Sequence, residues 1–325
     1  MATPPLFVKA AREIWSCEWN ILMNGLAPSD SKGNYKRPAN LQQEINIPTK
    51  EDLEHRDSDQ MPYLVIGKSC PWAHRVWIMH EIKGLKSTIN LRIAQVDSSG
   101  GRWIFEPNLK GCKTLKQLYK KCNNYQTKRA TLPVLFDPGE EAKSKFRLIS
   151  NESADLVNIL NEWPVNNNNF DLNPKKYHKK IINWHYLIQE NVNNGVYKCG
   201  FSRNQNAYEI ASENLFSILT IIEDNLNSNG PFLCGEELTI ADVRLFPTLI
   251  RWESIYEPLF KCSKKQIHSF PNILKWRKMI FNLHNINKTC DADAWREDYF
   301  GSLFPLNPSS IIPKGENISK IINQY

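Results

Sequence analysis

The stretch YLVIGKSCPWAHRVWIMH, residues 63–80, constrains this chain more than any other. It begins as an unbroken apolar strand, breaks at Gly67 and restarts as a helix at Pro71. Proline suits the first position of a helix because the N–H that it lacks would have no partner there. The pattern therefore predicts a buried strand that runs directly into a helix, with Cys70 at the junction.

The position of Cys70 predicts a reactive thiol. A sulfur at the first turn of a helix lies near unpaired backbone N–H groups and the positive end of the helix dipole. These surroundings lower the pKa of a cysteine, so we expect a thiolate near neutral pH. The alternative is a small buried hydrophobic residue, which is the role of most lone cysteines. Because residue 73 is alanine, any redox chemistry at Cys70 would require an external thiol.

The segments after this junction alternate between strand and helix patterns. We expect a strand over 89–96, a helical insert around 112–122, strands over 132–136 and 146–149, and a helix from about Ser150. Together with the opening strand and helix, this order is typical of a compact α/β layer.

The remainder of the chain divides by composition. Residues 1–60 are polar and broken by prolines, so we expect an extended arm with one early amphipathic helix. The α/β unit is assigned to 61–163, and the segment 164–176 is rich in Asn and Pro, as linkers are. Over 177–325, four segments carry apolar residues at helical spacing, which predicts an all-α domain with a Pro-punctuated tail.

Overall composition narrows the class of protein. Of 325 residues, 41% are hydrophobic and 23% are charged, a balance typical of a globular protein. No apolar run approaches the roughly 20 residues that a membrane span needs. The N-terminus lacks the apolar core of a secretory signal. We therefore expect a cytoplasmic protein with no membrane partner.

Charge and cysteine spacing argue against nucleic acid and metal. The net charge is +7, and the most basic stretch is 110–129. This stretch is expected to form a solvated helix and loop, or to attract a small anion weakly. No zinc-finger spacing or RNA-binding signature accompanies it, so no nucleic-acid partner is expected. The eight cysteines form no CxxC pair, which favours free thiols in a reducing compartment and no metal site.

The segment RATLPVLF, residues 129–136, supplies a second candidate binding feature. A proline that opens a strand after a helical insert suits a cis peptide bond, here at Pro133. That geometry would leave the backbone of Leu132 free to pair with an extended peptide. The alternative is a proline on an edge strand with no ligand.

The segment SNES, residues 150–153, opens the next helix. Helix N-termini bind carboxylates through backbone N–H groups, Ser153 adds a hydroxyl, and Glu152 adds a charge that could hold an ammonium group. Simple helix capping by Ser150 or Asn151 is the alternative. With Cys70 and Leu132, these groups would bind a small thiol peptide with a γ-glutamyl end, a description that glutathione fits.

Several motifs in order resemble the glutathionyl-hydroquinone reductases, the Xi class of glutathione transferases. They are SCPWAHR (69–75), GRWIF (101–105), LPVLF (132–136), SNES (150–153), NNGVYKCGF (193–201) and ADVRLFPTLIRW (241–252). The similarity extends from GNYKRPANLQQEI (33–45) to LNPSSIIPKG (306–315). It implies a thioredoxin-like N-terminal domain, an all-α C-terminal domain and a homodimer.

The resemblance also implies roles for residues. Cys70 matches the nucleophile, Tyr197 a proton donor, and Tyr256 and Tyr299 tyrosines that help stabilise the thiolate. Matches to the glutathione-binding residues are Trp103, Arg129, Leu132, Glu152 and Ser153, with Pro133 as the cis-proline. Without the motifs, Trp103 and each tyrosine would be taken for ordinary packing.

The chain departs from the family pattern at several positions. Leu132 stands where Val is common, Cys199 where Ala is usual, and Trp252 where Phe is usual. The tail motif, approximately HYYxSH in the family, is DYFGSL over 298–303, which keeps Tyr299 and loses both histidines.

These residues predict a cycle with glutathione as co-substrate and no metal. The Cys70 thiolate would attack the sulfur of an S-glutathionyl hydroquinone, Tyr197 would donate a proton to the ring carbon, and a second glutathione would release oxidised glutathione. Three alternatives remain: a conjugating transferase, an omega-like thiol transferase or dehydroascorbate reductase, and a non-enzymatic glutathione-binding module.

Overall fold

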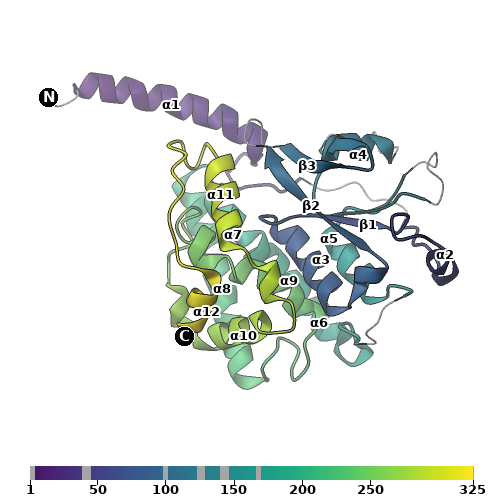
Figure 1. Cartoon of the computed structure of the whole chain (residues 1–325). Coiled ribbons are helices and arrows are strands. Elements are labelled where there is room, and N and C mark those ends of the chain that lie inside the picture. Colours follow the sequence, from purple (N-terminus) through teal and green to yellow (C-terminus); the bar gives the residue numbers. More distant parts are fainter. Residues whose placement is uncertain are drawn as a thin grey trace.

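The computed structural model describes residues 4–38, 45–97, 102–122, 129–139, 146–165 and 170–324. Parts of the expected arm (39–44), basic stretch (123–128) and linker (166–169) lie outside these ranges. Figure 1 shows a sheet with its helices on one side of the molecule and a helical bundle on the other.

A mixed six-stranded sheet has the order β4-β3-β2-β1-β5-β6. The strands are β1 (Tyr63–Gly67), β2 (Asn90–Asp97), β3 (Arg102–Leu109), β4 (Cys112–Thr114), β5 (Val134–Asp137) and β6 (Arg147–Ser150). Strand β1 lies parallel to β2 and antiparallel to β5. A central strand has both edges paired and both faces covered, which explains why β1 is apolar throughout and almost wholly buried.

Three helices accompany the sheet: α3 (Pro71–Ile82), α4 (Leu115–Lys121) and α5 (Ser153–Asn161). Helix α3 has Pro71 at its first position and ends before Gly84, which has the left-handed φ of 64° that suits a helix end. It packs against β1 and α5 on one side and the helical bundle's α9 on another. Because α3 is covered from both parts of the chain, residues on all of its faces are buried.

The helical bundle consists of α6 (His178–Ile188), α7 (Gly195–Gly200), α8 (Gln205–Ser228), α9 (Ile240–Leu249), α10 (Pro271–Phe281), α11 (Ala292–Ser302) and α12 (Ile318–Asn323). Two π-helical turns interrupt it, at Gln189–Asn193 and Trp252–Tyr256. Thr239 and Asp242 form a capping box at the start of α9. The architecture confirms the predicted combination of an α/β part and an all-helical part.

The N-terminal arm contains α1 (Pro5–Leu26) and the short α2 (Lys50–Glu54). Most of α1 projects from the body (Figure 1), and its C-terminal turns attach through buried Met23 and a hydrogen bond from Trp19 Nε1 to the Pro305 carbonyl. No helix among the described residues is both long and apolar enough to cross a membrane.

Several local predictions need correction. Strand β3 was not expected, because Glu106 and Pro107 break its alternation. Pro107 lies where the pairing of β3 with β4 is irregular, between Ile104 and Leu109, and a proline is tolerated at such an irregularity. Helix α5 begins at Ser153 rather than Ser150, since β6 continues through Ser150. Helix α12 lies in the region after about residue 300 that we read as tail. Helix α11 was not among the four helical segments that we expected, because its sequence has little apolar periodicity.

Candidate active site

Cys70 lies at the junction between β1 and α3, as the N-cap residue of the helix. Its extended backbone (φ −73°, ψ 111°) directs the chain from strand into helix. The thiol donates to the Leu132 carbonyl at 3.6 Å, and the nearby backbone N–H groups of Ala73 and Trp72 act to lower the pKa of the thiol. The Leu132–Pro133 peptide bond is cis. The junction therefore brings the sulfur, two helix amides and the Leu132 backbone into one place.

The prediction of a thiolate near neutral pH is wrong for the chain without ligand. Burial raises the pKa of the Cys70 thiol, because the charged form loses its contact with water. The amides of Ala73 and Trp72 and the charges of Arg37 and Arg251 act in the opposite direction. These groups favour the thiolate as expected, but they do not outweigh desolvation.

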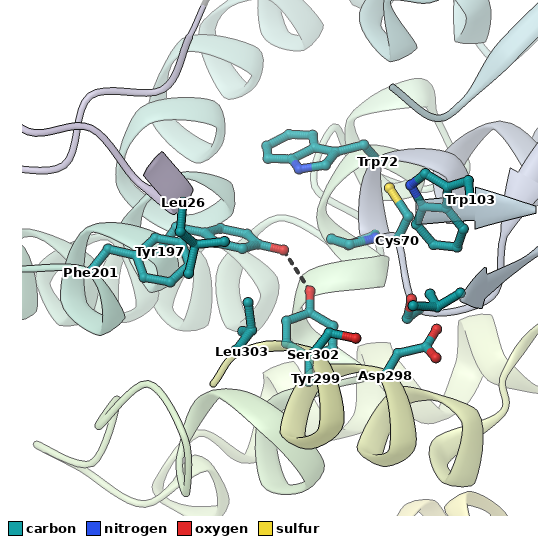
Figure 2. A pocket seen from close by; sticks show the side chains of 13 residues that line it. Leu26, Cys70, Trp72, Trp103, Tyr197, Phe201, Asp298, Tyr299, Ser302 and Leu303 are labelled. Atoms are coloured by element: carbon teal, nitrogen blue, oxygen red, sulfur yellow. Dashed lines mark hydrogen bonds between the residues drawn. The ribbon is translucent and has the colours of Figure 1, made fainter. Parts of the chain in front are cut away.

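A cavity of about 530 Å³ opens beside Cys70, between the sheet and the bundle (Figure 2). Its lining residues are Leu26, Ser69, Cys70, Pro71, Trp72, Val96, Trp103, Tyr197, Phe201, Asp298, Tyr299, Ser302 and Leu303. Aromatic side chains dominate the walls, a composition that suits a flat apolar ligand. Cys70 is the only cysteine among the residues that line the cavity.

Trp103 lies directly against the backbone of Gly67. A Cβ atom at residue 67 would lie 2.4 Å from the Trp103 ring and 3.1 Å from a methyl group of Leu132. Only glycine leaves room for the ring beside the sulfur. From the sequence we interpreted Gly67 only as the end of a strand. A glycine at the end of a buried strand, shortly before the cysteine, could have indicated that a side chain approaches the backbone closely there.

The three tyrosines gather on the bundle side of the cavity. The Tyr197 and Tyr299 hydroxyls form a hydrogen bond of 2.6 Å, and both residues line the cavity. Tyr256 is fully buried behind them, with its ring centroid 6.0 Å from that of Tyr197 and 6.3 Å from that of Tyr299. Burial raises the pKa of all three, so each remains a neutral hydroxyl.

The other predicted binding residues lie outside the cavity lining. Glu152 caps α5 by accepting a hydrogen bond from the Ala154 N–H, and the Ser153 hydroxyl donates to the Glu152 carboxylate at 3.4 Å. Glu152 itself is the capping residue, rather than Ser150 or Asn151. Arg129 is exposed near the arm, where its charge lowers the pKa of Tyr35 against the larger effect of burial.

The structure thus unites part of the predicted site. Cys70, Trp103, Tyr197 and Tyr299 surround one cavity, and Leu132 contacts Cys70. Tyr256 lies behind this group, while Arg129, Glu152 and the buried Ser153 are not among the residues that line the cavity.

Comparison with known proteins identifies the family. Family models for the glutathione S-transferase N-terminal and C-terminal domains match residues 69–163 and 205–278. The glutathionyl-hydroquinone reductase PcpF of Sphingobium chlorophenolicum is 34% identical over 262 residues, covering 78% of this chain and 82% of PcpF. The chain belongs to the Xi class of glutathione transferases, the glutathionyl-hydroquinone reductases.

Solved structures agree with this assignment. The glutathione-bound structure of YqjG from Escherichia coli K-12 aligns with a TM-score of 0.71 and 32% identity, over 79% of this chain and 85% of that one. The Xi glutathione transferase of Phanerochaete chrysosporium aligns with a TM-score of 0.77 and 28% identity, over 89% and 94%. This chain is therefore an enzyme of the glutathione transferase superfamily.

In this Xi-class chain, the N-terminal arm forms part of the site, which we had not predicted. Leu26 lines the cavity, and the guanidinium of Arg37 lies 3.5 Å from the centroid of the Trp72 ring. The Gly33 carbonyl accepts from the Arg203 N–H, and Tyr35 packs edge-on against Phe201, which hold the arm on the bundle. No local pattern in the sequence indicates contacts between such distant segments.

Arg251 is a second residue that sequence reasoning missed. It is fully buried, donates to the Lys68 carbonyl at 3.0 Å and to the Pro247 carbonyl at 2.8 Å, and contacts Nδ1 of His74 at 2.8 Å. Burial lowers the pKa of His74 well below its usual range, so the ring is neutral and accepts this hydrogen bond. Within the described ranges no carboxylate pairs with Arg251. Its positive charge therefore acts on the nearby Cys70 sulfur and lowers the pKa of the thiol.

Proposed function

We propose that this enzyme uses glutathione to remove glutathione from S-glutathionyl hydroquinones, through a mixed disulfide between Cys70 and glutathione. The observation that carries the proposal is a single cysteine beside an aromatic cavity, facing Tyr197 (Figure 2). A lone thiol can form a mixed disulfide but cannot resolve it internally, so a second glutathione must complete the cycle.

The proposed glutathione site follows the family assignment. The tripeptide backbone pairs with Leu132, Trp103 covers it, Arg129 neutralises a carboxylate, and the γ-glutamyl end reaches Glu152 and Ser153. In the free chain the Leu132 carbonyl accepts from the Cys70 thiol. A peptide N–H that takes over this carbonyl removes the acceptor of the S–H group. Removing that acceptor destabilises the neutral thiol and favours the thiolate.

In the first chemical step, the Cys70 thiolate attacks the sulfur of the glutathionyl thioether. A disulfide bond forms, the carbon–sulfur bond breaks, and its electron pair goes to the ring carbon. Tyr197 protonates that carbon, and hydroquinone leaves. Because burial raises the pKa of Tyr197, its hydroxyl carries the proton across the whole neutral range.

In the second step, a glutathione thiolate attacks the mixed disulfide. Oxidised glutathione leaves, the Cys70 thiolate returns, and the proton of the incoming thiol restores Tyr197. The overall reaction converts one S-glutathionyl hydroquinone and one glutathione into hydroquinone and oxidised glutathione.

The alternative that shares this cysteine is an omega-like thiol transferase or dehydroascorbate reductase. The cavity favours aromatic substrates, because Trp72, Trp103, Tyr197 and Phe201 all line it. The family assignment also supports a homodimer and a cytoplasmic location, which sedimentation and cell fractionation would test.

Steady-state reduction of S-glutathionyl menadiol by glutathione tests the proposal. We expect the wild-type enzyme to release menadiol and oxidised glutathione in equal amounts, and Cys70→Ser to lose at least about a thousandfold in kcat/KM. Cys17→Ser, which alters an exposed cysteine, is the matched control and should retain full activity. Equal rates for wild type and Cys70→Ser would refute the mechanism, and a strong preference for dehydroascorbate would favour the alternative.

A further inference from the structure

One charged side chain stands in the wall of the cavity. Of the described residues that line it, Asp298 is the only aspartate, glutamate, lysine or arginine. The remaining walls are aromatic or aliphatic, apart from Cys70 and two serine hydroxyls. A charge in such surroundings interacts strongly with any charged group that enters, because little water remains to screen it.

Helix α11 contributes Asp298 to the same cavity that Cys70 lines. In Figure 2, Asp298 lies on the side of the cavity below Cys70 and Trp103, while Tyr299 points toward Tyr197. Ser69, the residue immediately before Cys70, lines the same cavity as Asp298. Asp298 therefore lines the cavity in which the ring of a glutathionyl substrate would lie when its sulfur reaches Cys70 and its carbon reaches Tyr197.

Among the described residues, the charge of Asp298 is not paired. Lys68 is close enough to lower the pKa of Asp298, but its Nζ lies 2.8 Å from the Asp291 carboxylate. No ion pair to Asp298 is present in the described part of the chain. Burial raises the pKa of Asp298, as do the charges of Glu297 and Asp291, while Ser69 and Lys68 lower it.

We infer that Asp298 is a specificity-determining residue that makes the cavity select against hydroquinones bearing an acidic group on the ring. The inference rests on the proposed function and defines its substrate class as glutathionyl hydroquinones with neutral rings. A ring carboxylate beside Asp298 would place two like charges in a half-buried space. We expect the resulting penalty to be on the order of tenfold in kcat/KM.

The test compares two substrates that differ only in the hydroquinone half. One is S-glutathionyl menadiol, which has a neutral ring, and the other is the glutathione adduct of 2,5-dihydroxybenzoate, which carries a ring carboxylate. The ratio of their kcat/KM values removes the contribution of the glutathione half, which both substrates share. Asp298→Asn keeps the size and hydrogen-bonding capacity of the side chain while removing its charge.

We expect wild type to prefer the neutral ring, Asp298→Asn to shift the ratio at least about tenfold toward the carboxylate substrate, and Asp298→Glu to retain the wild-type preference. Glu297→Gln, which removes an exposed carboxylate from the same helix, is the control and should leave the ratio unchanged. An unchanged ratio in Asp298→Asn would overturn the inference while leaving the proposed function intact. If wild type reduced neither substrate, the proposed function itself would fail.

Discussion

The hydroxyl groups of Tyr197 and Tyr299 lie 2.6 Å apart in the wall of the cavity that opens beside Cys70. Tyr197 comes from α7 and Tyr299 from α11, so the packing of the bundle alone joins them. The hydrogen bond fixes the orientation of the phenol that we propose as proton donor.

Removing each hydroxyl in turn should distinguish the proton donor, Tyr197, from its hydrogen-bond partner, Tyr299. Tyr197→Phe should lower kcat roughly a hundredfold with little change in KM, because the ring carbon loses its acid. Tyr299→Phe should lower kcat only about tenfold, since it removes a partner of Tyr197 rather than the acid itself. Steady-state kinetics on S-glutathionyl menadiol would measure both, with Tyr186→Phe, an exposed tyrosine, as control. A larger loss of kcat in Tyr299→Phe than in Tyr197→Phe would indicate that Tyr299, and not Tyr197, is the proton donor.

The contact between Gly67 and Trp103 predicts a defect in glutathione binding. Gly67→Ala would force the Trp103 ring away from Cys70, because the new methyl group would lie 2.4 Å from it. We expect a raised KM for glutathione and a loss of about 1–3 kcal/mol in the free energy of unfolding. Kinetics and chemical denaturation would provide these values.

Two comparisons make this test specific. Gly25→Ala adds a methyl group that meets nothing within 4 Å, so it should be neutral or slightly stabilising. In a Trp103→Ala background, Gly67→Ala should lower the free energy of unfolding by clearly less, because the clashing ring is absent. Equal losses of unfolding free energy in both backgrounds would show that the destabilisation does not come from contact with Trp103.

The raised pKa of the Cys70 thiol predicts how its reactivity depends on pH. In the free enzyme, only a small fraction is thiolate at neutral pH, and that fraction grows about tenfold per pH unit until the pKa is passed. Alkylation of Cys70 by iodoacetamide should therefore accelerate without a plateau from pH 6 to about 9. A plateau near pH 7 would show that the helix amides and arginine charges outweigh desolvation.

The charge of Arg251 should lower the pKa of the same thiol. Arg251→Gln removes the buried charge that opposes desolvation, so the alkylation profile should move to higher pH, whereas Arg251→Lys should move it less. Both variants lose hydrogen bonds to the Lys68 and Pro247 carbonyls and should be destabilised by about 2–4 kcal/mol. The profile distinguishes the electrostatic role, because lost stability alone does not move a thiol pKa. Identical profiles for the Gln and Lys variants would exclude that role.

The sequence predicts the parts of the site that depend on local pattern. The apolar run before Gly67 and Pro71 after Cys70 place the cysteine at a strand-to-helix junction, and that junction is present. Strand β3 was not predicted because Pro107 breaks its alternation; this proline lies at an irregularity in the pairing of β3 with β4, where it is tolerated.

Other parts depend on contacts that no local pattern encodes. Arg37 reaches Trp72 only because the arm is held on the bundle through Gly33 and Tyr35. The thiol pKa was predicted in the wrong direction for the same reason. A helix N-terminus by itself favours the thiolate, but Cys70 is half-buried between the sheet and the bundle, and the resulting desolvation is larger.

The central claim is the mixed disulfide, and mass spectrometry of a single turnover tests it most directly. Enzyme mixed with S-glutathionyl menadiol in the absence of free glutathione should release one equivalent of menadiol and retain one glutathionyl group, mapped to Cys70 by peptide analysis. Added glutathione should then remove this group as oxidised glutathione. Release of menadiol from an unmodified enzyme, or modification of a cysteine other than Cys70, would contradict the account.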